Sequence, residues 1–403
     1  MLVYHAVLLG LLVGVTLLST VLAILNVRHG AREVQARGDW LTDRVGIDEP
    51  SKLIDYNRAT TGLGLLQTWT LVGALLGALY TGTLTGAVEA LNRSGLPPVA
   101  QGVVFFVGVA AAYRVLTTPF DLYSTFVVDE RFGFNETTPR LWMRDFLLGL
   151  VVLTALLAVL VAPLLALVEA LSTLLWVAGG WLVVVLFLLG TQILYPRVIA
   201  PLFNDFERVE AGDLRDGIER VFDRAGFDLE EVYTMDASRR STRLNAYFAG
   251  FGRAKRVVLF DTLVDRLEDP EIESVLAHEL AHWKFNHIWK QLATAALQVG
   301  VVLAVLGALL STEILYEMFA MPADATYAGL FVGLLAVYPL LELTAPLSNR
   351  LSLAHEREAD TFAVEVMGDS EPMADALAGL ARENLANPFP HPYYAAFNYT
   401  HPP

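Results

Sequence analysis

The chain has 403 residues, of which 55% are hydrophobic, and its formal charge is −15 at neutral pH. A soluble protein of this size rarely carries so many long apolar runs, and an acidic surface repels nucleic acid. Composition therefore favours an integral membrane protein and argues against nucleic-acid binding. The absence of cysteine excludes disulfides and thiolate ligands, so a bound metal must use histidine and carboxylate.

Seven stretches are long and apolar enough to cross a bilayer, which requires about 20 residues. They cover approximately 2–25, 63–91, 99–118, 146–171, 174–194, 288–310 and 326–347. The first stretch has neither a basic leader nor a small-residue cleavage site. We therefore expect it to be a retained span and not a signal peptide.

Arginine is distributed unequally among the loops between these spans. The first, third and fifth loops and the tail are rich in arginine, whereas the second, fourth and sixth are nearly free of positive charge. The positive-inside rule then predicts that the odd loops and the tail face the cytoplasm and that the N-terminus faces out. We expect a protein of the cell membrane, and the acidic, lysine-poor composition favours a microbial source from a salty habitat.

The long loop 195–287 predicts a folded insert. Residues 213–226 form an amphipathic helical pattern that ends at a glycine, and residues 231–236 predict a short strand. Residues 244–251 and 256–260 predict two strands of a hairpin, with the turn at 252–255.

A helix expected at 270–284 closes this insert and leads into the sixth span. Asp269 is its candidate N-cap, because the proline and acidic residues that follow suit a first helical turn. The helix contains His-Glu-Leu-Ala-His at 278–282. Histidines four residues apart lie about 40° apart around a helix axis, so His278 and His282 can share one metal ion. Glu279 is placed beside that metal, where it can take a proton from bound water.

A peptidase zinc site needs a third protein ligand and an open position for water. Glu356 and Asp360 are again four residues apart. Glu356 can bind zinc while Asp360 accepts the N–H of a ligating histidine. A solvated acidic helix face is the commoner meaning of such a run. Glu358 is the competing carboxylate, but it points away from the Asp360 face.

The HEXXH helix and the later Glu-x-x-Ala-Asp at 356–360 resemble the type I CAAX prenyl proteases, integral-membrane zinc endopeptidases that trim prenylated C-termini. The resemblance extends from the first loop to the last residue. The further matching stretches are Phe-Gly-Phe-Asn at 132–135, Tyr-Pro-Arg-Val-Ile-Ala-Pro-Leu-Phe at 195–203, Asn-Ala-Tyr at 245–247, Val-Leu-Phe-Asp-Thr-Leu at 258–263 and Asn-Tyr-Thr-His-Pro-Pro at 398–403.

The expected fold is mainly α and polytopic. The resemblance implies that seven transmembrane helices form a chamber and that a cytoplasmic α+β zinc-peptidase insert carries the HEXXH helix and a short hairpin. We divide the chain into spans one to five at 1–194, the catalytic insert at 195–287, spans six and seven at 288–348, and the third-ligand helix with the tail at 349–403.

The resemblance implies one Zn²⁺ per chain with Glu279 as general base. It also implies that Asn245, Ala246 and Tyr247 bind the substrate as an added strand, and that His401 stabilises the oxyanion of the tetrahedral intermediate. The expected partners are a peptide substrate, with its prenylation left open, and the lipid bilayer. No oligomeric partner is implied.

Three alternatives stay open at this point. One is a membrane metalloprotease of the heat-shock, quality-control type, whose members usually have fewer spans. Another is a transporter or receptor in which the motif is incidental, although no inverted repeat is visible. The third is a catalytically idle scaffold, which the complete set of ligand residues disfavours.

Overall fold

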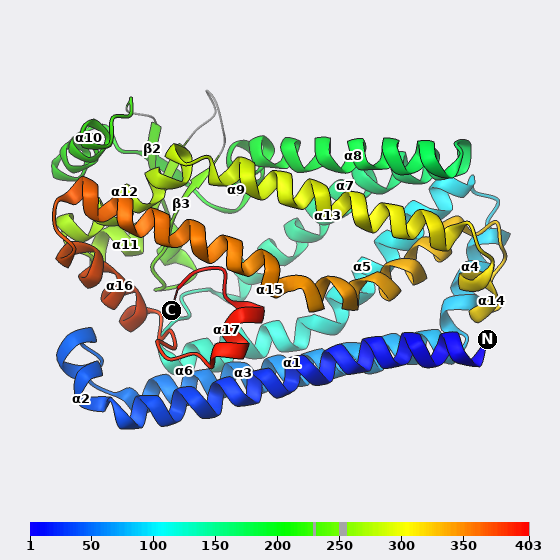
Figure 1. Ribbon diagram of the computed structural model, residues 1–403, viewed down its shortest axis with the longest axis horizontal. Helices are drawn as coiled ribbons and strands as arrows, with labels where there is room; N and C mark the ends of the chain where they lie inside the picture. The colour runs from blue at the N-terminus through cyan, green and yellow to red at the C-terminus, as the bar shows by residue number, and fades with distance from the viewer. Residues whose placement is uncertain (229–230, 250–255, 403) are drawn as a thin grey trace.

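The computed structural model describes residues 1–228, 231–249 and 256–402 (Figure 1). Its described part contains seven helices that are long and apolar enough to cross a membrane, as the sequence predicts. They are α1 (Leu2–Ala36), α3 (Pro50–Tyr80), α5 continued through α6 (Pro98–Phe132), α7 (Pro139–Ala170), α8 continued through α9 (Thr173–Phe203), α13 (His287–Leu310) and α15 (Thr326–Met367).

These spans run along the long axis of the molecule, and the insert gathers at one end of it (Figure 1). The N-terminus lies at the opposite end, near the two short helices α4 (Thr83–Arg93) and α14 (Ile314–Met318). The odd loops therefore share one end of the molecule with the insert. The alternation of arginine-rich and arginine-poor loops requires this arrangement.

The second span corrects a predicted boundary. The stretch 63–91 is not one helix, because α3 ends at Tyr80 and a separate helix begins at Thr83. The break falls at Gly82, whose φ of 83° is left-handed and ends a right-handed helix. At its other end α3 begins at Pro50, in a polar stretch that an apolar window misses.

The spans bury little surface against one another. The most apolar window of each span is at most 28% buried within the molecule. Close contact is local: a Cβ on Gly102 would lie 2.3 Å from Leu165 Cδ1 and 2.9 Å from Tyr327 Cβ. Such sparse packing suits helices that form the wall of a chamber, and it would be unusual in a solid bundle.

The insert contains a four-stranded sheet with the strand order β1-β2-β4-β3. The strands are β1 (Phe206–Arg208), β2 (Glu231–Met235), β3 (Ala246–Ala249) and β4 (Arg256–Phe260). β2 and β4 are parallel, and β1 and β3 pair antiparallel with β2 and β4. β2, β3 and β4 confirm the predicted strands, β1 is additional, and the predicted turn at 252–255 lies outside the described residues.

Helices surround this sheet. The predicted helix 213–226 is α10 (Asp213–Ala225), which ends at the left-handed Gly226. The metal helix is α12 (Asp269–Lys284). The remaining helical elements of the described chain are α2 (Gly38–Trp40), η1 (Leu41–Val45), η2 (Ser124–Asp129), α6 (Glu130–Phe132), η3 (Tyr195–Ile199), α9 (Ala200–Phe203), η4 (Ala237–Arg239), α11 (Asp261–Arg266), α16 (Glu371–Glu383) and α17 (Pro392–Asn398).

The N-cap of α12 differs from the prediction, whereas its end at Lys284 agrees with it. Glu268, not Asp269, is the N-cap, and it forms a capping box with Glu271. Glutamate at this position supplies the acceptor that the first N–H groups need, and Glu271 returns the bond to the N-cap. At the other end α12 does not continue into the sixth span. Asn286, with a left-handed φ of 57°, breaks the chain before α13.

The metal helix is held by an apolar core. Leu276 and Leu280 of α12 are fully buried and pack with Ile218 and Phe222 of α10 in one cluster that also contains Ala359 of α15. Burial of such side chains is worth about 1.5–3 kcal/mol each. The core therefore fixes α12 against α15. α15 contains both the seventh span and Glu356, so one continuous helix crosses the boundary that was predicted after residue 348.

Candidate metal centre

Three ligand atoms meet where α12 crosses α15. His278 Nε2 lies 3.3 Å from His282 Nε2 and 3.4 Å from Glu356 Oε2. His282 Nε2 lies 3.7 Å from Glu356 Oε1. The two histidines are one turn apart on α12, and the Glu356 side chain is only 3% exposed. These three residues form the metal-binding group found in the described part of the chain.

The separations fit a zinc ion. Ligand atoms about 2.0–2.2 Å from zinc in a tetrahedron lie about 3.3–3.6 Å from one another. The separations of 3.3 and 3.4 Å fall in that range, and the 3.7 Å from His282 Nε2 to the second Glu356 oxygen lies just above it. Two imidazole nitrogens and a carboxylate are also the donor set of many catalytic zinc sites, which leave a fourth position for water.

Asp360 orients the first histidine. Its Oδ1 lies 2.8 Å from His278 Nδ1, so the carboxylate accepts the Nδ1–H and leaves the Nε2 lone pair facing the ligand group. Against the lowering effect of burial, hydrogen bonds to Asp360 and Glu356 raise the pKa of His278 to about 10. Metal binding at Nε2 must therefore release a proton.

Two residues outside the sequence prediction orient the second histidine. His282 Nδ1 lies 2.9 Å from His287 Nδ1, and His287 Nε2 lies 2.8 Å from Glu358 Oε2. The carboxylate can only accept, so His287 donates from Nε2 and accepts at Nδ1, and His282 donates from Nδ1. Its Nε2 lone pair then faces Glu356. Burial lowers the pKa of His282 to about 4, which keeps this ring neutral.

His287 is fully buried at the start of α13, and its ring stacks on His355 with centroids 4.2 Å apart. The sequence did not predict a role for His287, because this residue lies five positions after His282 and off the helical face of the motif. Only the break at Asn286 turns it back toward the site. Glu358 does point away from the Asp360 face, as expected, but toward His287. A third histidine soon after the motif was the available signal.

Glu279 lies between the two ligand histidines along α12. Burial raises its pKa to about 7, Glu356 adds to the rise, and neighbouring His278 opposes it. Such a carboxyl exchanges protons near neutral pH, which suits a group that takes a proton in one step and returns it in the next. A bound divalent cation would lower this pKa.

The C-terminal tail returns to the same group. His401 Nδ1 lies 2.7 Å from Glu356 Oε2, although its side chain is 71% exposed. The hydrogen bond with Glu356 raises the pKa of His401. Asn349 Nδ2 donates to the Ala396 carbonyl at 3.1 Å and ties the tail to α15. The structure thus brings His401 beside the ligand set from a distant part of the chain.

The expected substrate strand lies at the edge of the sheet. Ala246 and Tyr247 belong to β3, which pairs only with β4 in the described sheet, and Asn245 precedes it. Asn245 Oδ1 accepts from the Ala246 N–H at 2.9 Å, and burial raises the pKa of Tyr247 to about 12. Within the described chain, no hydrogen bond joins these three residues to the metal group.

Comparison with known proteins adds two family matches. Residues 26–205 match the family "CAAX prenyl protease N-terminal, five membrane helices", and residues 208–403 match "Peptidase family M48".

Individual relatives agree. The chain is 36% identical to the CAAX prenyl protease 1 homolog of Arabidopsis thaliana, over 79% of this chain and 76% of that protein. It is 31% identical to CAAX prenyl protease 1 of Saccharomyces cerevisiae, over 79% and 74%. The crystal structure of S. mikatae Ste24p has the same fold, with a TM-score of 0.87 at 24% identity over 98% of this chain and 96% of that one.

The His287 contact predicts a loss of metal affinity. His287→Ala removes the acceptor of the His282 Nδ1–H, so zinc affinity measured against a competing chelator should fall about 10- to 100-fold. Glu358→Gln keeps an amide oxygen that can accept from His287, so its zinc affinity should fall less than that of His287→Ala. His5→Ala, a histidine at the far end of the molecule, is the matched control. Unchanged zinc affinity in His287→Ala would show that this ring does not orient the ligand.

Proposed function

The chain belongs to the CAAX prenyl protease family of M48 peptidases and is a membrane zinc metalloprotease, and we propose that it cleaves peptide bonds near the C-terminus of membrane-bound, prenylated peptides. The observation that carries the proposal is the convergence of His278, His282 and Glu356 at zinc-ligand spacing. Family membership removes the transporter with an incidental motif, and the matched N-terminal membrane domain favours this substrate class over quality-control proteolysis.

Each residue of the site has a proposed role. His278, His282 and Glu356 would hold one zinc ion, which when bound polarises the scissile carbonyl and lowers the pKa of water. Glu279 takes a proton from the attacking water and then gives a proton to the leaving amine nitrogen. This mechanism needs no covalent enzyme intermediate, in keeping with a chain that lacks cysteine.

The test of this function compares a farnesylated CAAX peptide with its unprenylated twin. We expect faster cleavage of the farnesylated peptide and complete loss of cleavage with a chelator. Glu279→Gln should keep zinc and lower kcat about 100- to 10,000-fold, because it removes the base and no ligand. Glu356→Ala should lose both zinc and activity. Equal cleavage of the two peptides would remove the prenyl group from the proposal, and wild-type turnover by Glu279→Gln would remove the base.

We also propose the orientation. The insert and the arginine-rich loops share one end of the molecule, so the metal centre would face the cytoplasm and the N-terminus the outside. Single cysteines in this cysteine-free chain test the assignment with a membrane-impermeant reagent. Glu317→Cys should be labelled in intact cells and Asp223→Cys only after permeabilisation. The reverse pattern would invert the topology.

His401 is proposed as the donor to the oxyanion. Negative charge grows on the carbonyl oxygen during attack. Removal of a hydrogen-bond donor fixed beside that oxygen typically lowers kcat about 100- to 1,000-fold. His401→Ala should therefore keep zinc and reduce kcat far more than it raises KM. His391→Ala is the control, since this histidine of the same tail packs on His29 with ring centroids 5.5 Å apart. Wild-type kcat in His401→Ala would exclude the role.

β3 is proposed to bind the substrate by strand addition. Its outer edge is unpaired in the described sheet, so its main-chain groups can receive an extended peptide. Asn245→Ala should raise KM severalfold, about the worth of one hydrogen bond, with zinc content unchanged. Thr234→Ala on the inner strand β2 is the control. Identical kinetics of Asn245→Ala and the wild type would take Asn245 out of the site.

A further inference from the structure

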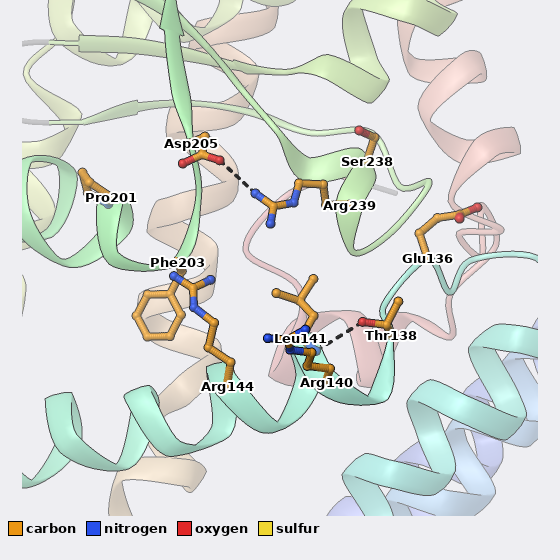
Figure 2. A pocket seen from close by; sticks show the side chains of 10 residues that line it. All are labelled: Glu136, Thr138, Arg140, Leu141, Arg144, Pro201, Phe203, Asp205, Ser238 and Arg239. Carbon is orange, nitrogen blue, oxygen red and sulfur yellow. Dashed lines mark hydrogen bonds and ion pairs between the residues drawn. The ribbon is translucent and has the colours of Figure 1, made fainter.

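A cavity of about 670 Å³ lies between the catalytic insert and the ends of two spans. Figure 2 shows its lining. Arg140 and Arg144 come from the first turns of α7, Phe203 closes the end of the fifth span, and Asp205 and Arg239 come from the insert. The cavity therefore sits where membrane helices meet the polar end of the molecule. It shares no lining residue with the metal centre.

Charge in the cavity is dominated by arginine. The lining contains three arginines against two carboxylates, which leaves one net positive charge in a chain that is strongly acidic overall. Arg239 is already paired with Asp236 at 2.7 Å and with Asp205 at 2.9 Å. Arg144 donates to the Leu202 carbonyl, and Arg140 has no hydrogen-bond or ion-pair partner in the described part of the chain.

The two arginines of α7 are only partly compensated. Asp145 is 3.7 Å from Arg144, but Arg240 holds that carboxylate at 2.9 Å. Arg140 and Arg144 are four residues apart on one helix face, where like charges repel. They also stand in the first turns of a helix, whose positive end disfavours cations. An anion in the cavity would relieve all three effects together.

The helix surface beside the arginines is apolar and exposed. Met143, Leu147 and Val151 form a stripe along α7 with exposures of 49%, 53% and 66%. The centre of this stripe lies about 40° around the helix from the arginine pair, and the stripe continues into the span. Trp142 stacks on Phe146 with ring centroids 5.2 Å apart, and aromatic rings are enriched where spans meet the membrane surface.

We propose that this cavity binds the phosphate headgroup of an anionic phospholipid, with the acyl chains along the exposed stripe of α7. The guanidinium groups of Arg140 and Arg144 would face a phosphodiester, which carries one negative charge. Guanidinium groups bind phosphate oxygens in pairs, and basic pockets beside spans suit anionic headgroups. A free anion would use the arginines but not the stripe.

Titration of the purified full-length protein with phosphatidylglycerol and phosphatidylcholine, in neutral detergent with native mass spectrometry, tests the proposal. We expect one phosphatidylglycerol per chain to bind in preference to phosphatidylcholine. The double variant Arg140→Gln and Arg144→Gln should bind it about 10- to 30-fold more weakly, since each basic residue near a lipid surface contributes about a fivefold gain. Leu147→Gln should also weaken binding, because it interrupts the acyl-chain path.

The matched control is Arg28→Gln with Arg32→Gln. These arginines are also exposed and four residues apart, on α1 and away from the cavity, and they should leave lipid binding unchanged. Zinc content and a single gel-filtration peak check the fold of every variant. Wild-type lipid affinity in the Arg140/Arg144 variant, or an equal loss in the control, would overturn the proposal. So would displacement of the lipid by inorganic phosphate at equal concentration, which would show a free-anion site.

Discussion

The structure depends on holding three electron-rich groups at one point. His278 Nε2 and His282 Nε2 lie 3.3 Å apart, and they lie 3.4 and 3.7 Å from the two oxygens of the Glu356 carboxylate. Such an arrangement is unfavourable unless a cation shares it, so the fold must enforce it. The apolar contact of α12 with α10 and α15 fixes the backbones, and Asp360 and the His287–Glu358 pair fix the two ring tautomers. The two histidines are therefore oriented by different chemistry, one by a carboxylate directly and the other through a second imidazole.

Helical periodicity explains why much of this centre could be predicted. His278 with His282, and Glu356 with Asp360, are pairs at i and i+4, so each pair shares a face whatever the surrounding fold. The geometry between the pairs is tertiary, and in the sequence only the need of a zinc site for a third protein ligand linked them. His287 follows no such period. Its place depends on a left-handed residue, Asn286, which ends one helix and starts another at an angle. His401 reached the site only through the returning tail.

The spans likewise have some features that sequence predicts and others that tertiary contacts decide. Their number follows from hydropathy, but their ends depend on residues that hydropathy ignores. α3 begins in polar sequence at Pro50, and α15 continues as a helix well past its apolar part. In both cases the protruding turns pack against protein at the insert end, and tertiary contacts sustain helix where composition predicts loop. Gly82 acts in the opposite sense and ends a helix inside an apolar run.

The length of α15 relates the membrane to the chemistry. From Thr326 to Glu356 the helix advances about 45 Å at 1.5 Å per residue, whereas the hydrocarbon core of a bilayer is about 30 Å thick. α15 is therefore long enough to cross the bilayer and still hold Glu356 outside the hydrocarbon on the same continuous helix. A peptide anchored in the bilayer by a short apolar group presents its chain at that depth. Because Glu356 is on the span's own helix, no flexible linker separates the membrane from the candidate metal-binding group. The arginine-lined cavity at the start of α7 lies at the same end of the spans. A lipid bound there would hold the insert at the membrane surface through a second contact.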